Sequence, residues 1–393
     1  MRSSRYWFYL LLISPFLNII NYRIGESYGF AIVLVLLLLF VLTDKKRRPL
    51  VKQEKKVFQI FVVSLIFILT GLFFSSFYSI DNFYYYRFFC LSFILIPVFL
   101  FRGDSGSFIR NKLLFILRYY IILITLSITI GFILKIAGLD QMEPMYDAEK
   151  WTYLDRPFGI FGQPSVNSGL LCFFYLFHRS AIKLWSDNYT ARMDYLFYIV
   201  TLGVILQGSG SGFLSYAFVL VGKLLGKKIN ISWGRLALGS GIVLLILYKI
   251  VVSGMVEKIS LDYIGALQEF IDVYLLTPYS QLIKNRAYLL WGVPDFPLSI
   301  DLGPLYMMGT IGLVVTVFIF LFLFFMTKKT KSLDMKLGII MLIVGNLHYP
   351  VMFYMVMHFM WYIIVYYVLV LEKSSVMTIK NANTYNWKKQ LYR

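Results

Sequence analysis

Residues 113–137 read LLFILRYYIILITLSITIGFILKIA, and Arg118 and Lys135 are the only charged side chains among them. A run of about 20 apolar residues is long enough to cross a bilayer as an α-helix. The whole chain shares this character: 59% of its 393 residues are hydrophobic, 15% are charged, and the mean hydropathy is +0.72. Soluble domains are closer to half apolar and a quarter charged. The composition therefore predicts a polytopic membrane protein of the all-α class.

We predict about twelve membrane-spanning helices in a single transmembrane domain that covers residues 1–393. Each corresponds to an apolar run of roughly 20 residues. The predicted spans are residues 6–22, 27–43, 57–79, 84–101, 113–137, 159–178, 194–207, 213–226, 236–252, 302–326, 337–349 and 352–371. The first run lacks the small-residue cleavage site of a signal peptide, so we interpret it as an uncleaved span.

The formal net charge is +18, which in a soluble protein would suggest a nucleic-acid partner. The placement of the charges argues against that partner. Lysine and arginine cluster in the short loops between alternate spans, at 45–56, 102–112, 179–192, 223–235 and 328–336, and in the tail after 373. Such a bias marks the cytoplasmic side of a membrane protein. We therefore predict a lipid bilayer as the surroundings, no nucleic-acid partner, and both termini in the cytoplasm.

Two longer loops are predicted on the outer face, at residues 138–158 and 253–301. Within the second loop, residues 260–276 place apolar side chains at helical spacing, which indicates a short amphipathic helix at the membrane interface. The sequence contains no separate soluble domain, so any chemistry is expected in these loops or between the helices.

A segment rich in polar residues, glycine and proline begins at the end of the first outer loop, DRPFGIFGQPSVNSG at residues 155–169. An arginine is permanently charged and suits phosphate recognition, and here Arg156 precedes a proline that favours extended backbone. Gly159 and Gly162 permit close approach of a ligand, and Pro164 can interrupt the helix. Irregular backbone at membrane depth is tolerated where it lines a cavity or is buried in protein. The alternative is a helix cap with an arginine that reaches to water.

Two further segments are candidate sites. LQGSGSGFLSY at residues 206–216 contains Ser209 and Ser211 in a turn whose amide groups could bind an anion, or which is simply a flexible connection. WGVPDFPLSIDLGPLYMMGTIGLV at residues 291–314 contains Gly292, Asp295 and Asp301. Asp301 is either a functional acid or the N-cap of the following span.

Arg286 is a second arginine in an outer loop, where topology requires no positive charge. Arg156 and Arg286 together fit a divided clamp for a diphosphate, although pairing with neighbouring acids is the simpler role. Among the histidines we keep His348 as a possible base. No DxD, HExxH or Walker A motif occurs, so we predict no metal site and no cofactor.

These segments, in this order, resemble the Wzy-type O-antigen and capsule polymerases, within the superfamily that includes the O-antigen ligases. The resemblance is carried by Arg156, Gly159, Phe161, Pro164, Asn167 and Gly169, then by the GSGSG turn, and then by Gly292, Asp301, Gly303, Gly309 and Gly312. It covers residues 155–325 and the overall topology. The ligases usually carry a histidine in the last large outer loop, and this chain has none between 179 and 347, which favours a polymerase.

The resemblance implies metal-independent glycosyl transfer on the outer face of the bacterial cytoplasmic membrane. The donor would be a glycan on undecaprenyl diphosphate, and a hydroxyl of the next lipid-linked repeat would attack it. Arg156 and Arg286 would bind the diphosphate, and Asp155, Asp295 or Asp301 would accept the proton. Substrate contacts are expected from Gly159, Gly162, Pro164, Asn167, Ser209, Ser211, Gly292 and His348. A chain-length regulator and a flippase of the same pathway are expected partners.

Two alternatives remain at this point. An O-antigen ligase would move finished glycan to an outer acceptor. A lipid-linked oligosaccharide flippase would carry charges along a central path, whereas the charged residues within these spans lie near the span ends. The product class, whether O-antigen, capsule or exopolysaccharide, stays open.

Overall fold

The structure is a computed structural model that describes residues 2–24, 105–146, 156–185, 194–225, 276–284, 303–349 and 351–372, with isolated positions at 32–66 and 290. Every element in these ranges is helical, and they contain no strand, which agrees with the predicted all-α class. The main helices are α1 (Arg2–Arg23), α5 (Ser105–Ile136), α6 (Pro164–Trp185), α7 (Tyr195–Gln207), α8 (Gly210–Leu225), α11 (Thr277–Lys284), α12 (Gly303–Ile311), α13 (Leu313–Lys329), α14 (Leu333–His348) and α15 (Met355–Tyr366). Short 3₁₀ turns occur at η1 (Asp140–Met142) and η5 (Val351–Phe353), and η6 (Tyr367–Leu371) is a π-helical end.

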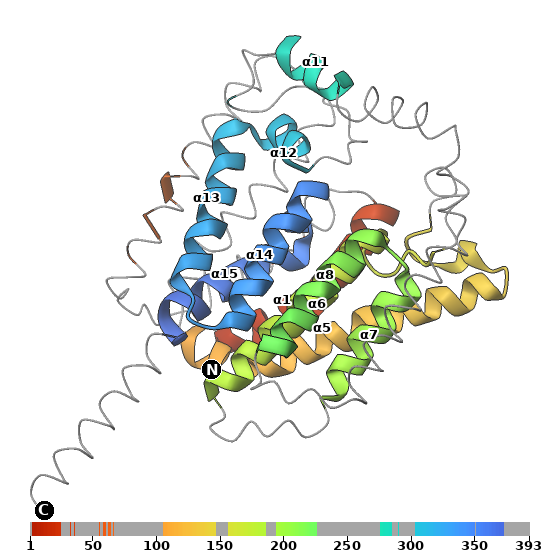
Figure 1. The fold of residues 1–393 in the computed structure, drawn as a ribbon, viewed down its shortest axis with the longest axis horizontal. Helices are drawn as coiled ribbons and strands as arrows, with labels where there is room; N and C mark the ends of the chain where they lie inside the picture. Colours follow the sequence, from red (N-terminus) through yellow and green to blue (C-terminus); the bar gives the residue numbers. More distant parts are fainter. Residues whose placement is uncertain are drawn as a thin grey trace, which may run out of the picture.

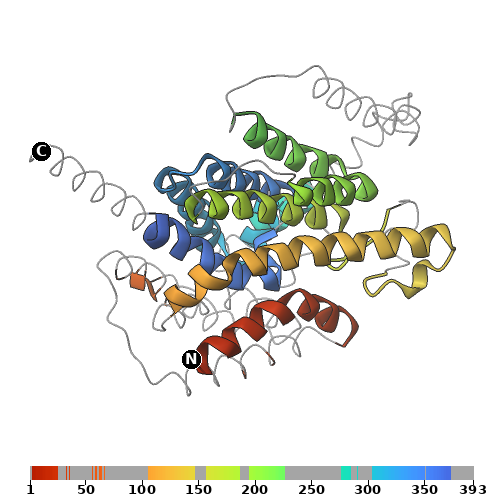
Figure 2. The same ribbon diagram turned by 90° about the horizontal axis from the view of Figure 1, so that it is seen from below.

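Helix α6 occupies the centre of the described helices and packs against α5, α7, α8 and α14 (Figure 1). Its side chains are buried almost continuously from Val166 to Ala181. Seen from below, α1 lies on one side of α5, and α7 and α8 lie on the other (Figure 2). A helix that is apolar on all sides must be enclosed by other apolar groups, which explains the central place of α6.

Small residues let the helices around α6 approach closely. A Cβ atom added to Gly203 of α7 would lie 2.5 Å from Leu171, and one added to Gly212 of α8 would lie 2.6 Å from Ser168. Glycine at such contacts brings two helix backbones together, as in tightly packed membrane helices. The start of α8 is therefore held directly against the first turns of α6.

The helices alternate in direction, so their polar termini gather at two ends. At one end, which we call the ion-pair end, α6 and α8 finish and α14 begins. Asp334 is buried there, 2.6 Å from Nζ of Lys183 and 3.6 Å from Nη2 of Arg179, and Arg179 also donates to the carbonyl of Gly222 at 3.2 Å. At the opposite end, the loop end, α5 and α7 finish and α6 and α8 begin.

Several predicted helix limits need correction. The predicted span 302–326 is two helices, because Gly312 adopts φ 85° between α12 and α13. The predicted span 159–178 begins at Pro164, which is the first residue of α6 and not a break within it, and the helix continues to Trp185. The GSGSG turn is shorter than predicted, because Gly208 is left-handed and α8 already begins at Gly210.

Within the described residues, one helix, Asn111–Ile136, combines the length and hydropathy needed to cross a bilayer, with a mean hydropathy of 2.2. Shorter apolar helices cover Phe8–Ile20, Tyr195–Gln207, Gly210–Leu225 and Val356–Leu371. The predicted spans 27–43, 57–79, 84–101 and 236–252 and the interfacial helix 260–276 lie outside the described ranges, apart from isolated positions. The twelve-span topology therefore stays a prediction.

Candidate functional site

The segment from Arg156 to Gln163 is irregular and leads directly into α6. Gly159 and Gly162 have φ values of 63° and 69°, and the amide of Gly162 donates to the carbonyl of Gly159 at 3.4 Å. Positive φ is accessible to glycine at little cost, so the two glycines allow the chain to fold back over the start of α6. We refer to residues 156–163 as the arginine loop.

Asn167, in the first turn of α6, holds this loop from inside. Its side chain is fully buried. The amide nitrogen donates to the carbonyl of Phe158 at 2.6 Å and to that of Gln163 at 2.8 Å, and the amide oxygen accepts from the N–H of Phe161 at 3.2 Å. Both amide hydrogens are thereby used within the protein, so Asn167 acts as a positioning residue for the arginine loop. Its predicted contact with substrate stays a prediction.

A buried carboxylate holds the loop from the other side. Glu143 is 3% exposed, and its Oε2 accepts from the N–H of Phe158 at 2.8 Å. It packs on α5 at Gly131, where an added Cβ would lie 2.5 Å from Oε1. Arg23 at the end of α1 donates to the carbonyl of Glu143 at 3.1 Å. Burial raises the pKa of Glu143, while hydrogen bonds from the N–H groups of Phe158 and Gly159 act against this rise.

Two more polar contacts fix the backbone of the loop. The buried Gln207, the last residue of α7, donates from Nε2 to the carbonyl of Pro157. Ser127 of α5 accepts from the N–H of Ile160 at 3.2 Å. Buried backbone groups need such partners, and here α5, α6, α7 and the first outer loop all supply them. The loop is consequently held by many contacts and is well suited to present a side chain in one geometry.

Arg156 is the side chain that this loop presents. It is half-buried, and the described part of the chain provides it with no hydrogen bond or ion pair. Burial lowers its pKa, but an arginine stays protonated at neutral pH because its ordinary pKa is so high. A partly desolvated guanidinium on a fixed loop is suited to bind an anionic oxygen, such as one of a phosphate.

Three serines connect the starts of α6 and α8. The hydroxyl of Ser209, which is 1% exposed, lies 3.0 Å from that of Ser165 and 3.1 Å from that of Ser211, and it accepts weakly from the N–H of Gly212 at 3.4 Å. The contact between Ser165 and Ser209 joins residues 44 positions apart in the sequence. The predicted GSGSG segment therefore lies beside the helix that follows the arginine loop.

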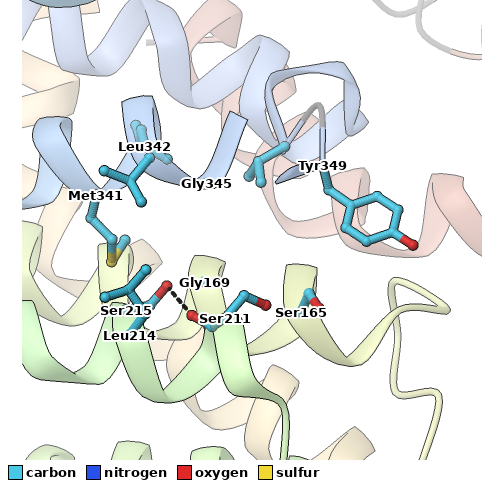
Figure 3. Close-up of a pocket in the computed structure, with 11 residues that line it drawn as sticks. Ser165, Gly169, Ser211, Leu214, Ser215, Met341, Leu342, Gly345 and Tyr349 are labelled. Atoms are coloured by element: carbon cyan, nitrogen blue, oxygen red, sulfur yellow. Dashed lines mark hydrogen bonds between the residues drawn. The ribbon is translucent and has the colours of Figure 1, made fainter. Parts of the chain in front are cut away.

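A small cavity of about 60 Å³ opens next to these serines (Figure 3). The described residues that line it are Ser165, Gly169, Ser211, Leu214, Ser215, Met341, Leu342, Val344, Gly345, Tyr349 and Val351. One wall is formed by α6 and α8, and the other by the end of α14 and the turn that follows it. Phe161 of the arginine loop packs edge-on against Tyr354, close to that turn, at a ring distance of 5.6 Å.

The structure brings seven of the predicted site residues to the loop end: Arg156, Gly159, Gly162, Pro164, Asn167, Ser209 and Ser211. His348 is the last residue of α14, at the same end, and its side chain lies outside what is described. Asp155, Arg286, Gly292, Asp295 and Asp301 also lie outside the described residues. Their predicted roles are untouched by the structure.

Several residues at the site were not predicted, among them Glu143, Gln207, Ser127 and Ser165. Glu143 is one of several acids in a loop and has no distinguishing sequence pattern. Gln207 is a polar residue at the end of an apolar span, directly before the GSGSG segment, and that position was a usable signal. Among the described residues, no group of three potential ligands is arranged to hold a metal ion.

No protein-family model matches this chain. Neither the curated proteins nor the solved structures contain a significant match.

Proposed function

We propose that this chain is a multi-pass membrane glycosyltransferase that joins lipid-diphosphate-linked repeats into a polysaccharide. The observation that carries the proposal is the arginine loop, in which a guanidinium that has no partner among the described residues is held on backbone that Asn167, Glu143 and Gln207 fix. A reaction that expels a diphosphate needs such a group, because negative charge develops on the leaving oxygen. We infer the reaction from the order of motifs along the chain, which resembles that of the Wzy-type polymerases.

The exposed face of α5 supports a membrane location. Phe115, Ile122, Leu126, Ile130 and Ile133 recur at helical spacing, and each is between 46% and 58% exposed. The opposite face of α5 is buried against the other helices. A contiguous exposed apolar stripe of this length is unfavourable in water and natural in a bilayer, where lipid tails cover it.

The distribution of basic residues supports the proposed orientation. Basic side chains occupy the last turns of α6, α8 and α13, at Lys183, Lys223, Lys328 and Lys329. The first two of these helices finish at the ion-pair end, opposite the arginine loop. The positive-inside rule then assigns the ion-pair end to the cytoplasm and the arginine loop to the outer face.

In the proposed reaction, a hydroxyl oxygen of the acceptor repeat forms a bond to the anomeric carbon of the donor glycan. The bond from that carbon to the diphosphate oxygen breaks, and the lipid diphosphate leaves with the electron pair. Arg156 stabilises the charge on the leaving group, with Arg286 as the proposed second arm of the clamp. The hydroxyl proton passes to a carboxylate, for which Asp155, Asp295 and Asp301 are the candidates.

Deletion of the gene tests the reaction class. We expect surface glycan with single repeats and no ladder on a gel, and lipid-linked single repeats that accumulate on the outer face. Full-length glycan stranded on its lipid carrier would instead identify a ligase. Single repeats trapped on the cytoplasmic face would identify a flippase.

The role of Arg156 is tested by complementing the deletion strain with Arg156→Ala. We expect a loss of about a hundredfold in polymerisation rate, the usual effect of removing one group that stabilises a developing anion. Lys336→Ala is the control, because Lys336 is also a half-buried basic residue but lies on α14 at the ion-pair end. If Arg156→Ala is inserted at normal levels and polymerises at the normal rate, Arg156 has no such role.

A further inference from the structure

The cavity beside the serines has a chemical character different from that of the arginine loop. None of the eleven described residues that line it is charged. Figure 3 shows Ser165, Ser211 and Ser215 on one wall and the aliphatic part of α14, with Met341, Leu342 and Gly345, on the facing wall. The described lining supplies no positive charge to offset a diphosphate, so it favours a ligand that is neutral at this point.

The hydroxyl groups still have hydrogen-bonding capacity for a ligand. Ser215 donates its proton to the carbonyl of Ser211 at 2.9 Å, so the lone pairs of its hydroxyl oxygen can accept. Ser165, Ser209 and Ser211 carry three hydroxyl hydrogens, and the two bonds among them use two. One hydroxyl hydrogen therefore remains, and whenever Ser209 donates to one of its neighbours this hydrogen belongs to Ser165 or Ser211, both of which line the cavity.

The size and the two walls limit the ligand further. A water molecule needs about 10–15 Å³ of such volume, so about 60 Å³ accommodates a group the size of about four to six waters. The ligand must accept and donate through hydroxyls on one side and present C–H groups to aliphatic side chains on the other. One edge of a sugar ring has these properties.

We infer that this cavity is a binding site for a neutral, hydroxyl-bearing edge of a glycan, and that it receives the acceptor repeat. This inference rests on the proposed function. The diphosphate of the donor is bound at the arginine loop, and the attacking group is a neutral hydroxyl. Ser165 links the two regions, because it lies two residues after the arginine loop and also lines the cavity. A glycan edge held there lies next to the loop that binds the leaving group.

The test separates binding of acceptor from binding of donor. The repeat oligosaccharide is released from its lipid by mild acid, labelled, and offered as the acceptor to the purified protein in nanodiscs, with lipid-linked repeat as the donor. In Ser215→Val, which removes the hydroxyl and adds a methyl group to the cavity, we expect the KM for the released oligosaccharide to rise about tenfold or more, as for the loss of a hydrogen bond. The KM for the lipid-linked donor should stay within twofold.

Ser215→Ala guards against misfolding of the valine variant, and Thr327→Val serves as the matched control. Thr327 also donates to a carbonyl one turn earlier, at 2.9 Å from Leu323, but it lies on α13 at the ion-pair end. An unchanged KM for the acceptor in both Ser215 variants would overturn the inference. An equal rise of both KM values would do the same, because it would indicate a general structural defect.

Hydrogen exchange gives a readout that does not depend on turnover. The released oligosaccharide at millimolar concentration should slow exchange in residues 209–216 of the native protein and have no such effect in Ser215→Val. Protection of this segment without any polymer formation would refute the polymerase while supporting a glycan site. Polymer formation without protection of this segment would refute the cavity as the acceptor site and leave the polymerase intact.

Discussion

Replacing Asn167 by leucine should loosen the arginine loop without emptying the space that the side chain fills. The change removes the partner of the Phe158 carbonyl and the partner of the Phe161 N–H. Neither group has another hydrogen bond in the described part of the chain. The carbonyl of Gln163 keeps a partner, because the backbone N–H of residue 167 also donates to it at 3.0 Å. Two buried backbone groups are thus left unpaired.

Each unpaired buried group costs about 1–3 kcal/mol, so the two together cost about 2–6 kcal/mol. Burial of the leucine side chain offsets part of this loss, so we expect a net destabilisation of about 2–4 kcal/mol. At about 2 °C per kcal/mol, the thermal midpoint should fall by about 4–8 °C. Because the loop carries Arg156, a small displacement of the guanidinium should also lower the polymerisation rate by about 10- to 100-fold.

The assay combines thermal melting of the purified protein with hydrogen exchange at Phe161 and a glycan ladder from the complemented deletion strain. Asn18→Leu is the control. Asn18 is also buried, but it makes one long hydrogen bond, 3.3 Å, to the carbonyl of Pro15 in its own helix. An unchanged midpoint and an unchanged exchange rate at Phe161 in Asn167→Leu would refute the role assigned to this amide.

Two further predictions concern the same loop. Burial raises the pKa of Glu143, so at pH values between its ordinary and its raised pKa the folded protein binds more protons than the unfolded chain. The free energy of unfolding therefore falls as the pH rises through that window. Glu143→Gln keeps an acceptor for the N–H of Phe158 and does not titrate. In melting curves from pH 4 to pH 8, the midpoint of this variant should depend less on pH than that of the native protein and should be no lower than the native midpoint at pH 7. A lower midpoint at pH 7 with an unchanged dependence on pH would contradict this. Gly159→Ala should destabilise the protein by about 1–3 kcal/mol more than Gly138→Ala. Both glycines have positive φ, but a Cβ added at Gly159 would lie 2.8 Å from the side-chain amide of Asn167, whereas one added at Gly138 meets nothing within 4 Å. Equal losses in chemical or thermal unfolding would show that the close contact does not matter.

Helix positions were largely predictable from the sequence, because apolar runs and helix propensity are local properties. The predicted span 113–137 ends one residue after α5, which begins earlier, at Ser105, and the predicted span 194–207 differs from α7 by one residue at its start. The break at Gly312 was missed, since an apolar run reads as one helix even where a single residue adopts positive φ. The boundary at Pro164 was missed for a related reason: a proline can interrupt a helix or begin one, and the sequence does not distinguish the two.

The candidate site was also predictable only in part from the sequence. The sequence identified the polar segments 155–169 and 206–216, because glycine, proline and charged residues are conspicuous between apolar runs. It could not show that Gln207 bonds to Pro157, 50 positions away, or that Glu143 accepts from Phe158, 15 positions away. These contacts depend on how α5, α6 and α7 pack, and packing is decided by side-chain shapes across the whole bundle.

Composition and periodicity were enough to predict a helical and highly apolar chain whose polar chemistry is confined to a few short segments. Which of those segments meet depends on how the helices pack. This packing gave Asn167 a positioning role through two fully used amide hydrogens, left Arg156 without a described partner, and placed three serine hydroxyls on one wall of a cavity. Periodicity and composition act over one helical run, whereas hydrogen-bond satisfaction in a buried loop requires partners from several helices at once.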